Sequence, residues 1–348
     1  MSKSTKIQKT YNILIRVLIL VVTYGFIYKK VFMGKDWLRN LIVFESYFKD
    51  WKFFATIILL VGLMFLNWGI ESIKWRFLIS KIEKLSLFQS IQAVFSGASI
   101  SIITPNRVGE YFARVFILEK ASHIQGILIT ILGSRSQLLI TILAGTTGLI
   151  LFSIGFASRV SLMVGSLYYV LLVILVIFDC LLLYFYFNVS YLALWREKLM
   201  KNRFKKFRKF FVVFSYFQHG DLCYVITLSF FRYVVFSLQY YILLRFFSVP
   251  VPFFQSLILT SVIFFVITLV PTIALTELGV RDSAALYFFG IFFSETGSLD
   301  DSLKVGILLA STMLWIINLV APAIIGTVFV NRLKFFRKDE PEPTSEGS

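Results

Sequence analysis

Long apolar runs dominate the chain and divide it into eight hydrophobic units. A helix needs about 20 apolar residues to cross about 30 Å of hydrocarbon, and six of the units meet or approach that length. We interpret these six as full transmembrane helices. They cover residues 12–30, 53–70, 124–156, 162–188, 222–247 and 304–330.

Each of the other two units is split into two short apolar pieces by a Pro-containing break. The first pair covers 88–103 and 108–119, and the second covers 255–270 and 280–293. Each piece would be roughly 18–24 Å long as a helix, which is too short for a comfortable crossing. Irregular backbone at membrane depth is tolerated only where protein or a polar cavity covers it. We therefore predict two Pro-broken re-entrant hairpins, each of which enters and leaves on one side.

This pattern predicts an all-α polytopic membrane protein with a single transmembrane domain over residues 1–335. Hairpins that enter from opposite faces indicate a possible inverted repeat, as in many transporters. Its halves would be about 10–190 and 222–330, joined by a basic cytoplasmic linker at 191–221. Residues 336–348 are polar and are predicted to form a disordered cytoplasmic tail.

Composition and charge support a membrane protein. Hydrophobic residues make up 58% and charged residues 16% of the 348 positions, against about 45–50% and about 25% in soluble chains. The net charge of +16 fits cytoplasmic loops rich in Lys and Arg better than nucleic-acid binding. Segment 196–209 has eight basic residues and one acidic residue, so we expect it to contact an anionic lipid surface from the cytoplasmic side. This placement puts both termini in the cytoplasm.

Motifs of soluble catalysis and of metal binding are missing from the sequence. There is no P-loop, no H-E-x-x-H and no G-x-S-x-G. His123 and His219 have no partner at metal-ligand spacing. We therefore expect no cofactor, no metal and no ATP hydrolysis, and a protein other than an enzyme. A catalytic alternative would depend on carboxylates inside the membrane, such as Glu110 and Glu277.

The break of the first predicted hairpin is rich in charge. It contains Thr104-Pro105-Asn106-Arg107-Val108-Gly109-Glu110, followed by Arg114. A charged side chain in hydrocarbon costs at least about 2.5–3.5 kcal/mol, so we expect these charges to have a partner or a function. The spacing i, i+3, i+7 predicts that Arg107, Glu110 and Arg114 share one helical face. Thr104 and Asn106 can cap the restarted helix, whose N-terminal N–H groups would favour an anion. Alternatively, the charges only pair with one another.

Further charges lie in the second break and inside two long spans. The stretch from Pro271 to Asp282 repeats the Pro, Thr, Glu, Gly and Arg of the first break, and Glu277 and Arg281 are spaced i, i+4. A simple turn with one salt bridge is the alternative there. Arg135 and Arg232 are predicted near the membrane midplane, either at a site or paired with Asp179 or with a hairpin Glu.

An interior rich in arginine suits a phosphate or another anionic head group, because guanidinium binds phosphate through two parallel hydrogen bonds. It suits a metal cation poorly. The candidate substrate-binding residues are Thr104, Pro105, Arg107, Gly109, Glu110, Arg114, Arg135, Arg232, Glu277, Gly279, Arg281 and Asp282.

Three stretches carry a family resemblance. They are Ile73-Lys74-Trp75-Arg76, the Pro-x-Arg-x-Gly-Glu motif at 105–110 with its flanks from Phe95 to Arg114, and Gly279-Val280-Arg281-Asp282-Ser283-Ala284. Together they resemble the lysylphosphatidylglycerol synthase transmembrane-region family, or flippase-like integral membrane proteins, over roughly 10–335. Asp282 stands where the family usually has Glu. The resemblance implies an inner-membrane protein of a bacterium or archaeon that is linked to lipid translocation or head-group modification. We expect a stand-alone member without the aminoacyl-transfer domain of larger relatives.

These observations favour a lipid flippase or transporter that moves an anionic or lipid-phosphate head group across the cytoplasmic membrane. Glu110 and Glu277 would orient the arginines or carry a coupling proton. Two alternatives stay open at this stage. One is an intramembrane lipid head-group or glycosyl transferase, and the other is a membrane scaffold for a soluble enzyme, with 196–209 as its docking face.

Overall fold

The computed structural model describes residues 51–102, 104, 107–156, 166–189, 212–270, 274–294 and 300–330, without the side chains of 156, 166–168 and 274–276. These residues form helices and the turns between them, so the prediction of an all-α polytopic membrane protein is confirmed. Five helical runs are long and apolar enough to cross a membrane. They are α3 (Trp51–Ile79), α6 (His123–Phe156), α7 (Ser166–Phe187), α10 (His219–Phe246) and the run made of α13 (Asp301–Trp315), η4 (Ile316–Val320) and α14 (Ala321–Val330). The predicted span 12–30, segment 196–209 and the tail 336–348 lie outside the described residues.

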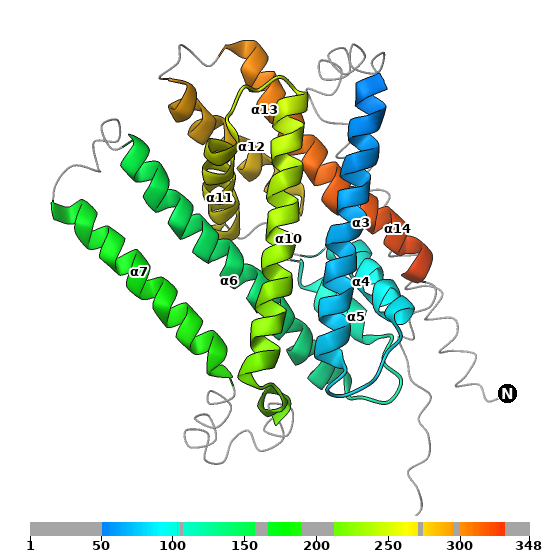
Figure 1. Ribbon diagram of the computed structural model, residues 1–348. Helices are drawn as coiled ribbons and strands as arrows, with labels where there is room; N and C mark the ends of the chain where they lie inside the picture. Colours follow the sequence, from blue (N-terminus) through cyan, green and yellow to red (C-terminus); the bar gives the residue numbers. More distant parts are fainter. Residues whose placement is uncertain are drawn as a thin grey trace, which may run out of the picture.

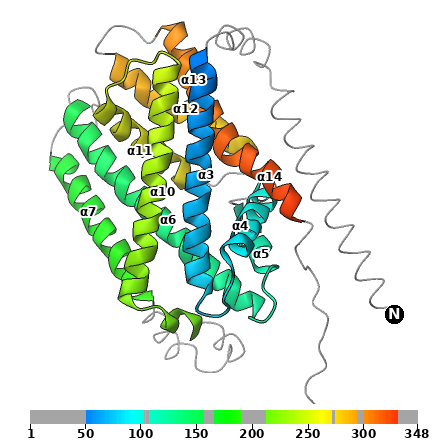
Figure 2. The ribbon, with the colours of Figure 1, turned by 45° about the vertical axis from the view of Figure 1, so that its right-hand side comes forward.

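The shorter helices form two pairs, as the broken apolar runs predict. The first pair is α4 (Leu87–Ser101) with α5 (Gly109–Val115), and the second is α11 (Phe253–Leu269) with α12 (Ala274–Phe293). The two members of each pair pack against each other. In both ribbon views α4 and α5 lie in the lower half of the molecule and α11 and α12 in the upper half (Figures 1 and 2). A short 3-10 helix, η3 (Val212–Tyr216), precedes α10.

Two predicted boundaries are wrong, for one physical reason. The second span does not end near residue 70, because α3 continues to Ile79, and the helix predicted to begin at 280 already begins at Ala274. In both places charged residues indicated a loop. In the structure Glu71, Lys74 and Glu277 are buried inside helices. Each has a partner of opposite charge: Lys74 pairs with Glu71 on the same helix, Glu71 also pairs with Arg114 and Arg232 of other helices, and Glu277 pairs with Arg107.

Helices α3, α6 and α10 pack on one another in the middle of the bundle. By contrast, α7 packs mainly on α6, and most of its large apolar side chains are exposed, as expected for a helix that faces lipid. The last run widens into the π-helical turn η4 just before Pro322. Pro322 has no N–H to donate to the carbonyl of Asn318, so a wider turn accommodates it.

Close approach of α14 and α4 depends on a small residue. A Cβ at Gly326 would collide with the backbone carbonyl oxygen of Phe95 and with the Ser99 hydroxyl. The same Ser99 hydroxyl donates a hydrogen bond to the carbonyl of Ala323 at 2.6 Å. Glycine therefore lets the two backbones meet, as small residues do in many membrane helix pairs.

Gly326→Ala should destabilise the protein by about 1–3 kcal/mol, because the added methyl group must push α14 away from α4. The measurement is the midpoint of thermal unfolding in detergent. Gly62→Ala is the matched control, since Gly62 lies in a helix and an added Cβ there would meet nothing within 4 Å. Equal midpoints for the two variants would contradict this account of the α4–α14 contact.

Candidate functional site

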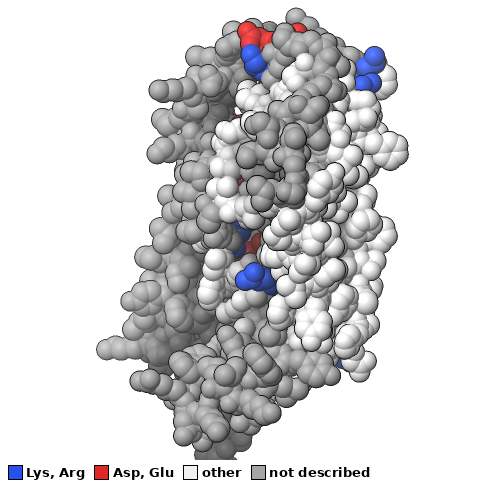
Figure 3. Space-filling model, turned by 90° about the vertical axis from the view of Figure 1, so that its left-hand side faces the viewer, with Lys and Arg blue, Asp and Glu red and all other residues white. Residues whose placement is uncertain are grey.

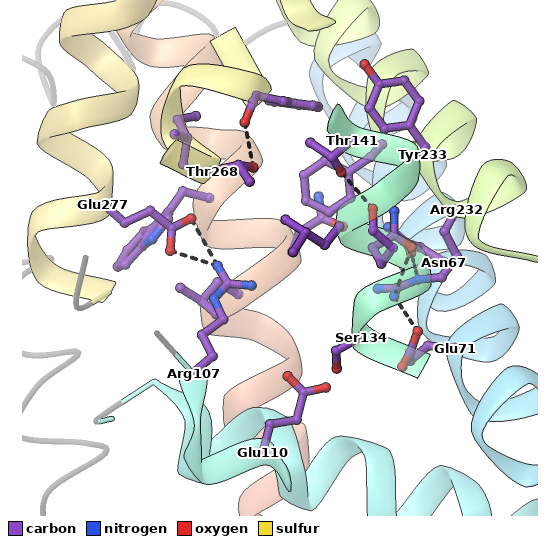
Figure 4. A pocket seen from close by; sticks show the side chains of 18 of the residues that line it. Asn67, Glu71, Arg107, Glu110, Ser134, Thr141, Arg232, Tyr233, Thr268 and Glu277 are labelled. Carbon is purple, nitrogen blue, oxygen red and sulfur yellow. Dashed lines mark hydrogen bonds and ion pairs between the residues drawn. The ribbon is translucent and has the colours of Figure 1, made fainter. Parts of the chain in front are cut away.

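A cavity of about 580 Å³ lies where the two helix pairs meet. Its walls come from α3, α5, α6, α10, α11, α12, α13 and η4, and from the residue that precedes α5. Figure 4 shows side chains from these elements converging on it. Five cations and three carboxylates line the cavity: Lys74, Arg107, Arg135, Arg232, Arg281, Glu71, Glu110 and Glu277. The volume is within the usual range for a small-molecule or head-group site.

Arg107 joins the first break to the second helix pair. Its Nη2 donates to both carboxylate oxygens of Glu277, at 2.8 and 3.0 Å. The Nη2 of Arg281 donates to Glu277 Oε1 at 2.8 Å, which confirms the predicted i, i+4 pair. Glu277 therefore binds two arginines, one from each helix pair.

The predicted face shared by Arg107, Glu110 and Arg114 is wrong. Helix α5 begins only at Gly109, and Arg107 precedes it with a φ of 57°. This left-handed conformation is uncommon for a residue with a Cβ. It places Arg107 outside the helical register, so its side chain turns to Glu277. Glu110 and Arg114 remain on one face of α5 and form an ion pair.

Glu71 is the most heavily engaged carboxylate in the described part of the chain. It forms ion pairs with Lys74 Nζ at 2.7 Å, with Arg114 Nη1 at 2.7 Å and with Arg232 Nη1. Only 3% of Glu71 is exposed. Because a lone charge is very costly in such a place, each of these four groups depends on the others for its compensation.

Asn67 completes this arrangement on the side of α3. Its Oδ1 accepts a hydrogen bond from Arg232 Nε at 2.7 Å, and the Arg232 guanidinium lies 6.0 Å from the ring centroid of Trp68. The sequence interpretation missed Asn67 and Glu71 as site residues. The available signal was their spacing with Lys74, i, i+4, i+7, which puts three polar side chains on one face of an otherwise apolar helix.

Arg135 differs from the other cations of the cavity. It lies on α6, is exposed and lines the cavity, and no hydrogen bond or ion pair joins it to another described residue. The pairing with Asp179 considered from the sequence is not found. Asp179 instead accepts a hydrogen bond from the Thr146 hydroxyl at 2.6 Å.

The remaining sequence candidates have supporting positions or lie elsewhere. The Thr104 hydroxyl accepts a hydrogen bond from the N–H of Gly109 at 2.9 Å and so caps α5, as predicted. A Cβ at Gly109 would lie 2.8 Å from the Thr104 side chain, so this close turn needs glycine. Arg114 lies behind the cavity wall, and Gly279 and Asp282 are not among the lining residues. Pro105 and Asn106 lie outside the described residues.

Charged atoms of the described residues are visible from one side of the bundle. Figure 3 shows this side, across the long axis of the helices, with basic and acidic atoms set back in a recess about halfway between the two ends, beside uncharged residues. Charged groups at mid-height are uncommon on the surface of a membrane protein, which makes this cavity the candidate functional site.

Fold and cavity together define a polytopic helical membrane protein with an arginine-rich site between two broken helix pairs. Residues 13–299 match the family described as Lysylphosphatidylglycerol synthase TM region, so the chain belongs to that family. The family gives the protein a lipid-related role in the membrane. No protein with a curated description and no solved structure matched the chain.

Glu71→Gln should destabilise the protein by about 3–5 kcal/mol, because it leaves buried cations without their compensating charge. The measurement is unfolding in mixed detergent micelles followed by tryptophan fluorescence. Asp301→Asn is the matched control, since Asp301 also pairs with a lysine at i+3, Lys304, but its side chain is 85% exposed. A Glu71→Gln variant as stable as the control would refute the structural importance of Glu71.

Proposed function

We propose that the protein moves a lipid with an anionic head group across the membrane, with the head group passing through the cavity. The observation that carries this proposal is the excess of positive charge at mid-height, including Arg135 with no partner among the described residues. Spare guanidinium groups are costly away from water and favour a bound anion. The acyl chains would stay in the surrounding lipid while the head group enters from the side.

We propose further that the two helix pairs are re-entrant hairpins that enter from opposite faces of the membrane. The lengths of three of the four helices support this arrangement, since α4 has 15 residues, α5 has seven and α11 has 17, each too short to cross alone. The fourth helix, α12, has 20 residues but is not among the helices apolar enough to span a membrane. The Arg107–Glu277 ion pair joins the two tips. A phosphate that binds Arg107 would compete with Glu277 and so loosen the contact between the hairpins.

Cysteine labelling from one side of sealed vesicles tests the hairpins, in a background with Cys180 and Cys223 replaced by Ser. Lys84→Cys and Lys120→Cys flank the first pair and should react with an impermeant maleimide from the same side. Ser248→Cys and Ser302→Cys flank the second pair and should react only from the opposite side. All four positions are exposed. Reaction of Lys84→Cys and Lys120→Cys from different sides would contradict a re-entrant first pair.

Transport itself is tested in liposomes that contain the purified protein and a fluorescent anionic lipid, with leaflet accessibility as the readout. Arg107→Gln should slow lipid movement by about tenfold or more, because it removes a guanidinium group that could donate two parallel hydrogen bonds to the head group in the cavity. Arg245→Gln is the matched control, since Arg245 is exposed at the end of α10 and does not line the cavity.

Both variants must elute as folded protein in size-exclusion chromatography before their rates are compared. If the unmodified protein moves no lipid of any class, the transport proposal fails. If a lipid acquires a new mass during incubation, the alternative of an intramembrane transferase is favoured instead.

A further inference from the structure

The charges around the cavity do not balance. Five cations line it, against three carboxylates. Glu71 contacts Lys74 and Arg232 of the lining, Glu277 contacts Arg107 and Arg281, and Glu110 pairs with Arg114 behind the wall. Two positive charges are therefore left over among the lining residues. A ligand with one negative charge would leave half of that excess, and a cationic head group would increase it.

The hydrogen-bonding groups are unbalanced in the same direction. Arg281 Nε and Nη1, Asn67 Nδ2 and Trp315 Nε1 are donors with no acceptor among the described residues. These three side chains line the cavity and are at least nine-tenths buried. Among the buried lining atoms, the acceptor left without a donor is the Oδ1 of Asn318, while the hydroxyl of Tyr233 can act either way. The four donor atoms are themselves covered in the structure, so side-chain rotation would be needed to bring them to a ligand. Buried polar atoms are normally paired, and an excess of unpaired donors in the lining favours a ligand that consists of acceptors.

Cations stand on opposite walls of the cavity. In Figure 4, Arg107 and Glu277 lie on one side, while Arg232, Asn67 and Glu71 lie on the other, with Glu110 below the space between them. A further cation, Arg135, comes from α6, the helix that also contributes Ser134 to the lining. Groups on both sides of the space could bind one compact anion through several oxygens at once.

We infer that the group recognised in this cavity is a phosphate with two negative charges, as in a phosphate monoester or a pyrophosphate, and not a phosphodiester. A monoester offers three terminal oxygens and close to two negative charges at neutral pH. It therefore supplies acceptors for the unpaired donors and negative charge for the excess cations. A phosphodiester offers one charge and two terminal oxygens. This inference rests on the proposed function, in which the phosphate is the head group of a lipid.

The test is direct binding to the purified full-length protein in detergent micelles. The probes are farnesyl phosphate, its methyl phosphodiester and inorganic phosphate. At pH 8 the monoester should bind about tenfold or more tightly than the diester, which has the same chain and one charge fewer. At pH 5 only about a tenth of the monoester remains doubly charged, since its second pKa is about 6, and the preference should largely disappear.

The diester controls for titration of the protein over the same range. The titratable groups that face the ligand are Glu71 and Lys74 on α3, Glu110 and Tyr111 on α5, Tyr233 on α10 and Glu277 on α12, while the arginines stay charged. A change in these groups alters the binding of both probes. Because the charge of the diester is constant, an unchanged affinity of the diester between pH 5 and pH 8 shows that the lost preference reports the charge of the monoester.

Arg135→Gln should weaken binding of farnesyl phosphate at pH 8 by about tenfold and reduce its advantage over the diester. Because Arg135 has no partner among the described residues, its loss leaves no carboxylate uncompensated. Arg245→Gln should bind both probes as the unmodified protein does.

Equal binding of monoester and diester at pH 8 overturns the inference, even if the protein transports lipid. A monoester preference without any lipid movement in liposomes supports the inference and overturns the proposed function. Inorganic phosphate that binds as tightly as farnesyl phosphate supports recognition of the doubly charged group, but it names free phosphate as the ligand and counts against lipid transport.

Discussion

Glu71 is the charge on which the interior of this protein depends. It is buried in α3 and contacts cations from three helices, α3 itself, α5 and α10. In a bundle whose other contacts are mostly apolar, this carboxylate makes it possible to keep Arg114 and Arg232 away from water. Through these ion pairs Glu71 links α3 to α5 and to α10.

The breaks in the two helix pairs serve the same site. At the first break the chain turns through the left-handed conformation of Arg107, and Thr104 caps the helix that restarts at Gly109. At the second, α12 begins early enough to bring Glu277 and Arg281 to the cavity. Irregular backbone inside a membrane needs protein or a polar space around it, and the cavity supplies that space. The strained and charged positions therefore gather where a ligand would bind.

A cavity with more cations than carboxylates is best understood as a site completed by an anion. All three carboxylates of the lining already form ion pairs with arginines of the protein. The positive charge that they do not neutralise is available to a ligand. In the proposed function, a lipid would present its head group at the recess at mid-height while its chains stay in hydrocarbon. This arrangement unites the lipid-related role of the family with the chemistry of the cavity.

The sequence by itself determined the helical class, the long spans of the described part and the two Pro-broken pairs, because the length of an apolar run and a helix-breaking residue act locally. It also identified Arg107, Glu110, Arg135, Arg232, Glu277 and Arg281 as intramembrane charges, since charge in an apolar run is conspicuous. Only the tertiary structure decided their partners. Arg232 meets Glu71 across 161 residues and Arg107 meets Glu277 across 170, and no local pattern encodes such contacts. For the same reason Glu71 was interpreted as the end of a span, whereas packing against Arg114 and Arg232 keeps it inside the helix.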